Sequence, residues 1–194
     1  MTKNETLKDG TKLVVRELTL QDIDALMKFY LSLPAEDRKY LRVDVTDRDT
    51  IEQRTRRIEK GGVTRLIALR GDEIIADAAL ELSAEEWRRN QGELRVIVAK
   101  PFQRKGLGMI LMKELYFLAL QKEVETVIVK MMRPQAAAHK LCHKMGFHEE
   151  MVIPDYVVDQ DGETQDLIIM KSSIKYLLEE MEHFFTDTDW QRCQ

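Results

Sequence analysis

The chain has 194 residues, 44% of them hydrophobic, which is enough for one domain with a sizeable core. Its formal net charge of −4 argues against nucleic acid as a bulk electrostatic partner. The two cysteines, Cys142 and Cys193, show no paired spacing, which suits a reducing compartment. Residues 1–5 are polar and there is no run of about 18 apolar residues, so we expect a soluble, cytoplasmic protein without a membrane partner.

The first part of the chain predicts one strand followed by helices. Residues 1–10 are polar and are expected to lack regular structure. Residues 12–18 alternate between apolar and polar side chains, which is the pattern of a half-buried strand. Residues 19–22 resemble a capping box and open a helix that runs to Leu33. Further helices are expected over residues 35–41 and 49–60.

The later part predicts strands that alternate with helices and also form hairpins. Residues 63–69 and 73–82 flank a turn signal, Arg-Gly-Asp-Glu, and predict a hairpin. Apolar side chains at helical spacing mark a helix from Leu107 to about Leu120. The other expected elements are strands over 93–98 and 125–130, a helix over 135–145, a hairpin over 147–156 and 164–171, and a terminal helix over 172–185. This order predicts an α/β (α+β) fold with a mixed sheet.

A turn rich in glycine and basic residues lies directly before the expected helix at Leu107. Gly106 and Gly108 stand at the helix N-terminus, where a ligand can approach the main chain without meeting a Cβ atom. The first amides of a helix lack intrahelical partners and lie at the positive end of its dipole, so they suit a phosphate group. Arg104 and Lys105 add positive charge at the same place. No P-loop string and no complete dinucleotide fingerprint occurs, and the pattern favours a diphosphate site of another kind.

The string Gln103-x-x-Gly106-x-Gly108 resembles the acyl-CoA signature Gln/Arg-x-x-Gly-x-Gly/Ala of the GNAT N-acetyltransferase superfamily. A second string downstream is similar to the superfamily's Asn-x-x-Ala-x-x-Leu-Tyr-x-Lys-x-Gly-Phe at every position but two. Gln135 stands in place of the asparagine and Cys142 in place of the tyrosine. The order of expected elements over residues 12–171 also matches.

This resemblance implies a GNAT-like, mostly antiparallel central sheet flanked by helices, with an extra C-terminal helix. Residues 1–171 would form the acetyltransferase domain, and residues 172–194 would be a helical extension packed on it. The apolar face of that extension could instead contact a second copy of the chain, so the expected state is a monomer or a homodimer.

The resemblance also implies acetyl-CoA as the acyl donor. In the superfamily the pantetheine arm lies along the strand that here ends at Val98, as though it were an added strand, and the diphosphate lies on the glycine turn. The alternative for the glycines is a tight turn that binds nothing. The residues implied for acetyl-CoA binding are Val98, Gln103, Arg104, Lys105, Gly106, Leu107, Gly108, Met109 and Gln135.

Transfer of an acetyl group to an amine needs a base, because free primary amines are mostly protonated at pH 7. Glu93 is the first candidate, since it opens the strand that leads to the thioester and some superfamily members carry a catalytic glutamate there. The alternative for Glu93 is a surface pairing with Arg95. Glu81, near the end of the preceding strand, is the second candidate and Asp77 the third.

Cys142 is the candidate acid, because it stands where many members have a tyrosine that protonates the leaving thiolate. A thiol with a pKa of about 8.5 can donate a proton, but its reach is shorter than that of a tyrosine. The alternative is a small buried cysteine that only packs. Tyr116 or Tyr156 could take the role instead.

The expected function is an N-acetyltransferase in which an amine attacks acetyl-CoA directly in a ternary complex. His139 and His143 are four residues apart but have no third ligand, so no metal is expected. Residues 31–42 loosely resemble a segment of bacterial protein-lysine acetyltransferase domains, which makes a protein lysine the leading acceptor and a small amine the second. The competing function is a non-catalytic acyl-CoA-binding sensor or regulatory module that has lost the acid.

Overall fold

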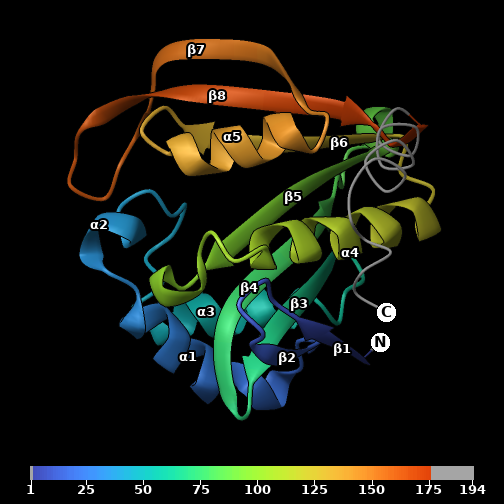
Figure 1. Ribbon diagram of the computed structural model, residues 1–194. Coiled ribbons are helices and arrows are strands. Elements are labelled where there is room, and N and C mark those ends of the chain that lie inside the picture. Colours follow the sequence, from blue (N-terminus) through green and yellow to red (C-terminus); the bar gives the residue numbers. More distant parts are fainter. Residues whose placement is uncertain (1, 176–194) are drawn as a thin grey trace.

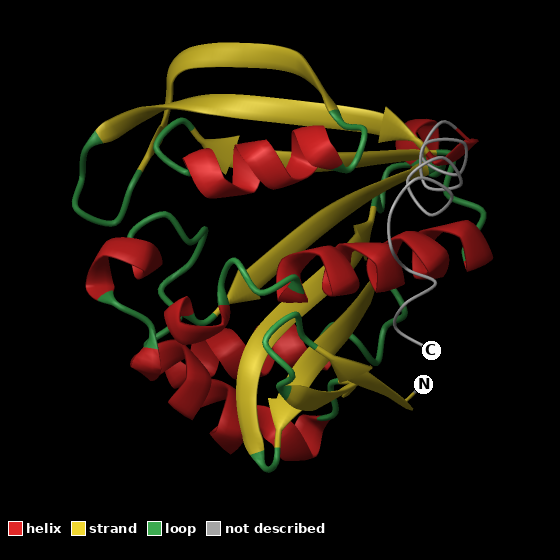
Figure 2. Ribbon diagram, viewed as in Figure 1, coloured by secondary structure: helices red, strands yellow, loops and turns green. Residues whose placement is uncertain are grey.

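One mixed β-sheet runs through residues 2–175, the part of the chain that the computed structural model describes (Figures 1 and 2). Its eight strands lie in the order β1-β2-β3-β4-β5-β6-β8-β7. Every neighbouring pair is antiparallel except β5 and β6, which confirms the expected mixed, mostly antiparallel sheet. The strands are β1 (Thr2–Thr6), β2 (Lys12–Glu17), β3 (Val63–Arg70), β4 (Glu73–Leu82), β5 (Gln91–Val98), β6 (Thr126–Met132), β7 (His148–Val158) and β8 (Thr164–Ser173).

Helices cover both faces of this sheet. Helices α4 and α5 lie over one face and helices α1 and α3 over the other, each with its own buried apolar cluster (Figure 1). The helices are α1 (Ile23–Ser32), α2 (Ala35–Arg38), α3 (Arg48–Arg56), α4 (Leu107–Gln121) and α5 (Ala136–Lys144), with short 3-10 turns η1 (Leu20–Asp22), η2 (Glu86–Arg88) and η3 (Lys100–Phe102). Between η1 and β8, the elements follow the expected order.

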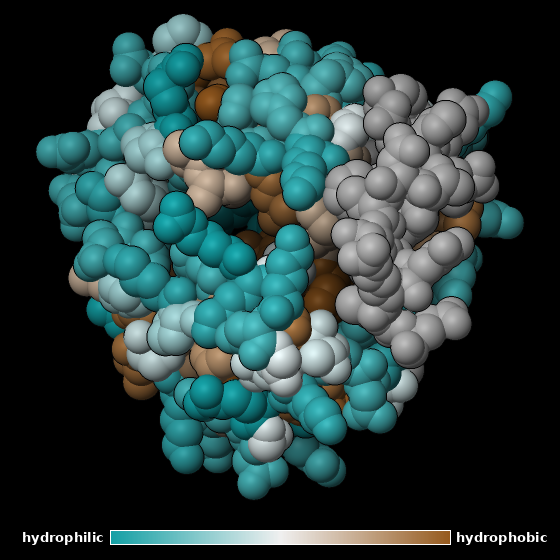
Figure 3. All heavy atoms as spheres, viewed as in Figure 1, coloured by the Kyte–Doolittle hydropathy of each residue, from teal (hydrophilic) through white to brown (hydrophobic). Residues whose placement is uncertain are grey.

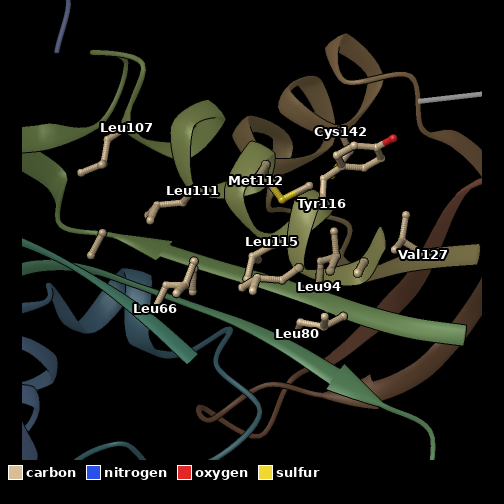
Figure 4. Packing of buried hydrophobic residues seen from close by; sticks show 14 of the residues in the cluster. Leu66, Leu80, Leu94, Leu107, Leu111, Met112, Leu115, Tyr116, Val127 and Cys142 are labelled. Atoms are coloured by element: carbon tan, nitrogen blue, oxygen red, sulfur yellow. The ribbon is translucent and has the colours of Figure 1, made fainter. Parts of the chain in front are cut away.

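The larger core lies between α4 and the middle of the sheet. Apolar side chains on one face of α4 point at the strands, and each is removed from water (Figure 4). Burying one leucine contributes about 2 kcal/mol, so this contact fixes the start of α4 relative to β5. The facing side chains include Leu107, Leu111 and Leu115 from the helix and Leu66, Leu80 and Leu94 from the sheet.

Two expectations at the ends of the chain need correction. Residues 1–10 were expected to lack regular structure, yet Thr2–Thr6 form β1, an edge strand paired with β2. This segment has no apolar face, and an ion pair of 2.6 Å from Lys3 to Glu114 of α4 helps to fix it. Residues 172 and 173 end β8 instead of opening the terminal helix. The rest of that expected helix beyond residue 175 lies outside the described residues.

The one parallel pair of strands separates early. β5 and β6 are in register at only three positions, and the last of them joins Glu93 to Ile128. Beyond Glu93 the two strands diverge, while β5 stays paired with β4 as far as Val98 (Figure 1). The main chain of β5 on the β6 side therefore lacks a strand partner along its second half.

Candidate active site

The turn before α4 combines left-handed backbone with a helix N-terminus. Gly106 has a φ of +94° at the N-cap position, a conformation in which any side chain would be strained. Arg104 also has a positive φ, of 62°. The first amides of α4, which have no intrahelical partners, follow directly after Arg104 and Lys105. The turn thus brings two cations and unpaired amides together, which is the chemistry that a diphosphate requires.

Gln103 ties this turn to the end of β5. Its Nε2 atom donates a hydrogen bond of 2.9 Å to the main-chain oxygen of Val98. The next residue, Ala99, donates its N–H to the oxygen of Ile75 in β4, at 2.9 Å. Because main-chain groups alternate sides along a strand, the polar groups of Val98 face away from β4, toward the gap. Gln103 therefore links the open edge of β5 to the glycine turn.

The second glycine has a packing role. A Cβ atom on Gly108 would lie 3.1 Å from Cδ2 of Leu141, so a side chain there would require the Leu141 side chain of α5 to shift by a few tenths of an ångström. At the start of α5, the Oε1 atom of Gln135 accepts a hydrogen bond of 2.8 Å from the Met132 N–H. Gln135 therefore stabilises the turn between β6 and α5 through its side-chain oxygen. Its side-chain nitrogen is available to donate a hydrogen bond to a ligand.

The candidate acids lie in different surroundings. Cys142 is buried in the core beneath α5, and this burial raises the pKa of its thiol to about 12. Tyr116 is also buried, and its hydroxyl donates to the main-chain oxygen of Ile174 at 3.0 Å. Tyr156 is 63% exposed on the outer strand β7. None of these three residues is in the glycine turn.

Glu93 lies at the last paired position of β5 and β6, where the gap between them begins. Its Oε2 atom is 3.0 Å from Nζ of Lys130, and its Oε1 atom contacts the guanidinium of Arg42. That Oε1 atom is buried and makes no well-aligned hydrogen bond. The alternative expected from the sequence was a pairing of Glu93 with Arg95. That pairing is wrong, because Arg95 contacts Glu81.

Glu81 lies directly opposite Glu93 across β4 and β5. Two carboxylates in this position repel each other, and each is balanced by its own cations. Glu81 contacts Arg95 and lies 3.2 Å from Arg54 of α3. A cavity of about 110 Å³ opens between the two glutamates, lined by Glu81, Leu82, Ser83, Arg88, Gln91, Gly92, Glu93, Ile128 and Lys130.

A bridge between two loops holds Arg42 near Glu93. The Nε2 atom of Gln160, in the turn between β7 and β8, donates to the main-chain oxygens of Leu41 at 3.2 Å and Val43 at 2.8 Å. Arg42 lies between these two residues, and its guanidinium also reaches the main-chain oxygen of Lys130 at 3.5 Å. The sequence does not predict the contacts of Gln160, Arg42 and Glu93, since no pattern in the chain links positions so far apart.

Asp77, the third candidate base, belongs to a closed buried group. Its Oδ2 atom accepts hydrogen bonds from the Tyr30 hydroxyl at 2.8 Å and from Nη2 of Arg65 at 2.5 Å. Burial and the nearby Asp77 charge raise the pKa of Tyr30 well above its ordinary value. Burial alone would lower the pKa of Arg65, but the Asp77 carboxylate more than offsets this. Asp77 therefore serves to join α1 to β3 and β4.

His139 and His143, the pair singled out in the sequence, both lie on helix α5. Within residues 2–175, no group of three or more His, Cys, Asp and Glu side chains is placed to hold a metal ion. His139 contacts Glu149, with 3.2 Å between Nε2 and Oε2, and its ring stacks edge-on against His143. Over the same residues, no helix has the length and apolar character needed to cross a membrane.

Comparison with known proteins identifies the family. Residues 26–147 match the family described as the Acetyltransferase (GNAT) family, which is more than half of the chain. The chain belongs to the GNAT family of acetyltransferases, and the expected enzyme class, an acyltransferase, is confirmed. No curated protein sequence gives a significant match.

Solved structures share the fold at low sequence identity. An acetyltransferase of the GNAT family from Streptococcus pneumoniae is 20% identical, with a TM-score of 0.71 over 83% of this chain and 99% of that one. A ribosomal-protein-alanine N-acetyltransferase from Brucella melitensis is 24% identical, with a TM-score of 0.71 over 82% and 98%. A putative acetyltransferase from Salmonella typhimurium, solved with acetyl-CoA, is 20% identical, with a TM-score of 0.72 over 84% and 94%.

The surface is hollowed where the turn, β5 and α5 meet. In the space-filling view a recess with hydrophobic atoms at its base lies between α5 and the turn that opens α4 (Figure 3). The unpaired edge of β5 and the cations of the turn border the same region, while Glu93 and Glu81 project from the other face of the sheet, toward α3. The gap between β5 and β6 thus lies between the glycine turn on one face of the sheet and the two glutamates, with the cations that contact them, on the other.

Proposed function

We propose that this protein transfers an acetyl group from acetyl-CoA to a primary amine, by direct attack in a ternary complex. The observation that carries the proposal is the parting of β5 and β6 beyond Glu93, directly beside the glycine turn at Gly106. Such a gap gives two substrates access to one point from opposite faces of the sheet, and holding two reactants in line lowers the barrier to their reaction. Residues 1–171 are the proposed catalytic domain.

The donor side suits acetyl-CoA in three ways. The open edge of β5 offers main-chain groups to the amides of the pantetheine arm, as a sheet edge does to an added strand. Gly106 and the first amides of α4 suit the diphosphate, with Arg104 and Lys105 supplying charge. The side-chain nitrogen of Gln135 faces no competing partner among the described residues and suits a pantetheine carbonyl.

The acceptor side suits an amine. A primary amine arrives as an ammonium ion and must lose a proton before it can attack the thioester carbonyl carbon. Glu93, at the root of the gap, is the proposed base that takes this proton, directly or through a water. As the new C–N bond forms and the C–S bond breaks, the CoA thiolate leaves and takes up a proton. Glu81, whose charge is balanced by Arg95 and Arg54, is the second carboxylate that lines the cavity where the amine would bind.

The proposed acceptor is the side chain of a protein lysine. The cavity between Glu81 and Glu93, of about 110 Å³, is lined by both carboxylates and has room for the ammonium end of an alkyl amine. One structural relative, the enzyme from Brucella melitensis, is named for acetylation of an alanine of a ribosomal protein, which supports a protein as acceptor without pointing to lysine in particular. A small linear amine fits the same cavity and is the second acceptor class.

One observation favours a different function. Cys142 is buried with a raised pKa, and the carboxylate of Glu93 is already engaged by Arg42 and Lys130. A domain that only senses acetyl-CoA would bind it in the same way and would need neither an acid nor a free base. The distinction between the two functions is turnover, since a sensor releases no free thiol with any amine.

The first experiment is a calorimetric titration with acetyl-CoA, together with a melting curve at saturation. At 100 times the dissociation constant, binding adds about 2.7 kcal/mol to the free energy of unfolding and raises the Tm by several degrees. Thiol release is then measured with a lysine-containing peptide and with a linear diamine. Binding with thiol release supports the enzyme; binding without release under both amines supports the sensor. Absence of binding at millimolar acetyl-CoA would overturn both.

A further inference from the structure

The N-terminal hairpin of β1 and β2 reaches the glycine turn. Its loop is anchored in the main core by Leu7, which is only 3% exposed. The next residue, Lys8, donates its main-chain N–H to the oxygen of Lys105 in the turn, at 3.2 Å. A segment almost 100 positions earlier in the chain is therefore bonded to the proposed diphosphate site.

The side chain of Lys8 lies along Gly106. A Cβ atom placed on Gly106 would be 3.7 Å from Cγ of Lys8 and 3.8 Å from its Cε. The ammonium group is one bond beyond Cε, so this positive charge lies beside the N-terminus of α4. No carboxylate among residues 2–175 forms an ion pair with it. Lys8 is thus an exposed cation with no anion of its own, next to a turn built for anions.

The following residue has the opposite charge and holds another cation of the turn. The Oδ2 atom of Asp9 lies 2.9 Å from Nζ of Lys105, and its Oδ1 atom accepts from the Thr11 N–H at 3.0 Å. The contact with Lys105 holds the pKa of the Asp9 carboxyl well below its usual range, so Asp9 is charged at neutral pH. Asp9 therefore competes with any phosphate for Lys105.

We propose that Lys8 binds the diphosphate of acetyl-CoA, and that Asp9 holds Lys105 in place and weakens its attraction for the same group. The inference rests on the proposed function, because it assumes that acetyl-CoA is the ligand of the turn. It assigns a binding role to a hairpin outside residues 26–147, the segment that matches the family. The two neighbouring side chains then have opposite effects on affinity, since one attracts the diphosphate and the other repels it.

The test compares acetyl-CoA affinities by calorimetry at low salt. Lys8→Met should weaken binding about fivefold, the effect of one partly screened charge, and Lys8→Arg should restore it. Asp9→Asn should tighten binding by about twofold or more, because it frees Lys105. Lys28→Met, on an exposed position of α1 at the other face of the sheet, is the matched control for net charge and should change nothing. Far-UV circular dichroism and melting curves check that each variant is folded.

A second ligand locates the contact. Acetyl-dephospho-CoA keeps the diphosphate but lacks the 3′-phosphate, so Lys8→Met should weaken its binding by the same factor. If Lys8→Met binds acetyl-dephospho-CoA as tightly as the wild type does, Lys8 contacts the 3′-phosphate instead of the diphosphate, and the assignment is overturned. Equal affinity of wild type and Lys8→Met for acetyl-CoA, or weaker binding by Asp9→Asn, would also overturn it. If the wild type binds no acetyl-CoA, the proposed function itself fails.

Discussion

At the scale of single residues, the site is organised around Glu93. Its carboxylate stands where β5 and β6 part, and Arg42 and Lys130 already contact it. In the proposed mechanism, an incoming ammonium ion shares or displaces these contacts before Glu93 takes its proton.

Glu93→Gln should therefore lower turnover about 10²-fold or more and leave the affinity for acetyl-CoA unchanged. The amide keeps the shape of the side chain but cannot accept a proton. Glu81→Gln is the matched control, because Glu81 lies directly opposite in the register and lines the same cavity. This control should mainly raise the KM of the amine. Equal turnover of Glu93→Gln and wild type would remove Glu93 from the mechanism.

Cys142 allows a prediction about pH. Burial raises its pKa to about 12, well above that of an ordinary thiol, so proton transfer from it to a CoA thiolate is unfavourable. The thiol stays neutral in the folded protein from pH 7 to pH 9, and we expect iodoacetamide to leave it unmodified over this range. Peptide mapping by mass spectrometry measures this. Rapid modification of Cys142 in folded protein would show that it is accessible and ionised.

At the scale of elements, the buried group of Asp77, Arg65 and Tyr30 joins the helical face to the sheet. Asp77 and Arg65 come from β4 and β3, and Tyr30 comes from α1. All three side chains are buried, so each polar atom depends on the others for its hydrogen bonds. The group fixes the position of α1 beneath the carboxylates of the acceptor side.

Asp77→Ala should lower the free energy of unfolding by about 3–5 kcal/mol, because it leaves the Arg65 charge buried without a partner. Tyr30→Phe removes one hydroxyl and should cost about 1–2 kcal/mol. Asp24→Ala, an exposed position on α1 paired only with Arg48, is the control and should cost less than about 1 kcal/mol. Urea denaturation gives the three values. Similar losses for Asp77→Ala and Asp24→Ala would contradict this account.

At the scale of the whole molecule, the sheet consists of two antiparallel sets of strands that separate along β5 and β6. Strands β1 to β5 form one continuous antiparallel set and β6 to β8 another, and the two sets meet at only three positions. The end of β5 beyond the last paired position leads to the glycine turn, and a hydrogen bond joins that turn to the N-terminal hairpin. A ligand that lies along β5 would supply the hydrogen bonds that β6 does not.

Acetyl-CoA should therefore slow amide hydrogen exchange over residues 94–98 and 104–109 by about tenfold or more at saturation. Residues 63–70 of β3, already paired on both sides, serve as the internal reference and should change little. Mass spectrometry of peptic fragments measures the exchange. Protection confined to the turn, with none along β5, would show that the pantetheine arm does not follow the strand.

Features that depend on contiguous residues could be predicted from the sequence. Apolar periodicity placed α4 and the paired strands, and the glycine spacing located the turn. Strand β1 was missed because its alternating side chains are all polar, and only pairing with β2 makes it a strand. The role of Gly108 was also hidden, since Leu141 approaches it from another helix.

The sequence by itself determined the order of elements from η1 to β8, the position of the glycine turn and the family, because each depends on short runs of neighbouring residues. Only the tertiary structure decided which cations contact Glu93, that Arg95 pairs with Glu81, and that Lys8 lies against Gly106. These contacts join residues far apart in the chain. They depend on strand register and on the packing of loops, and a shift of one residue in a strand would turn every side chain to the other face.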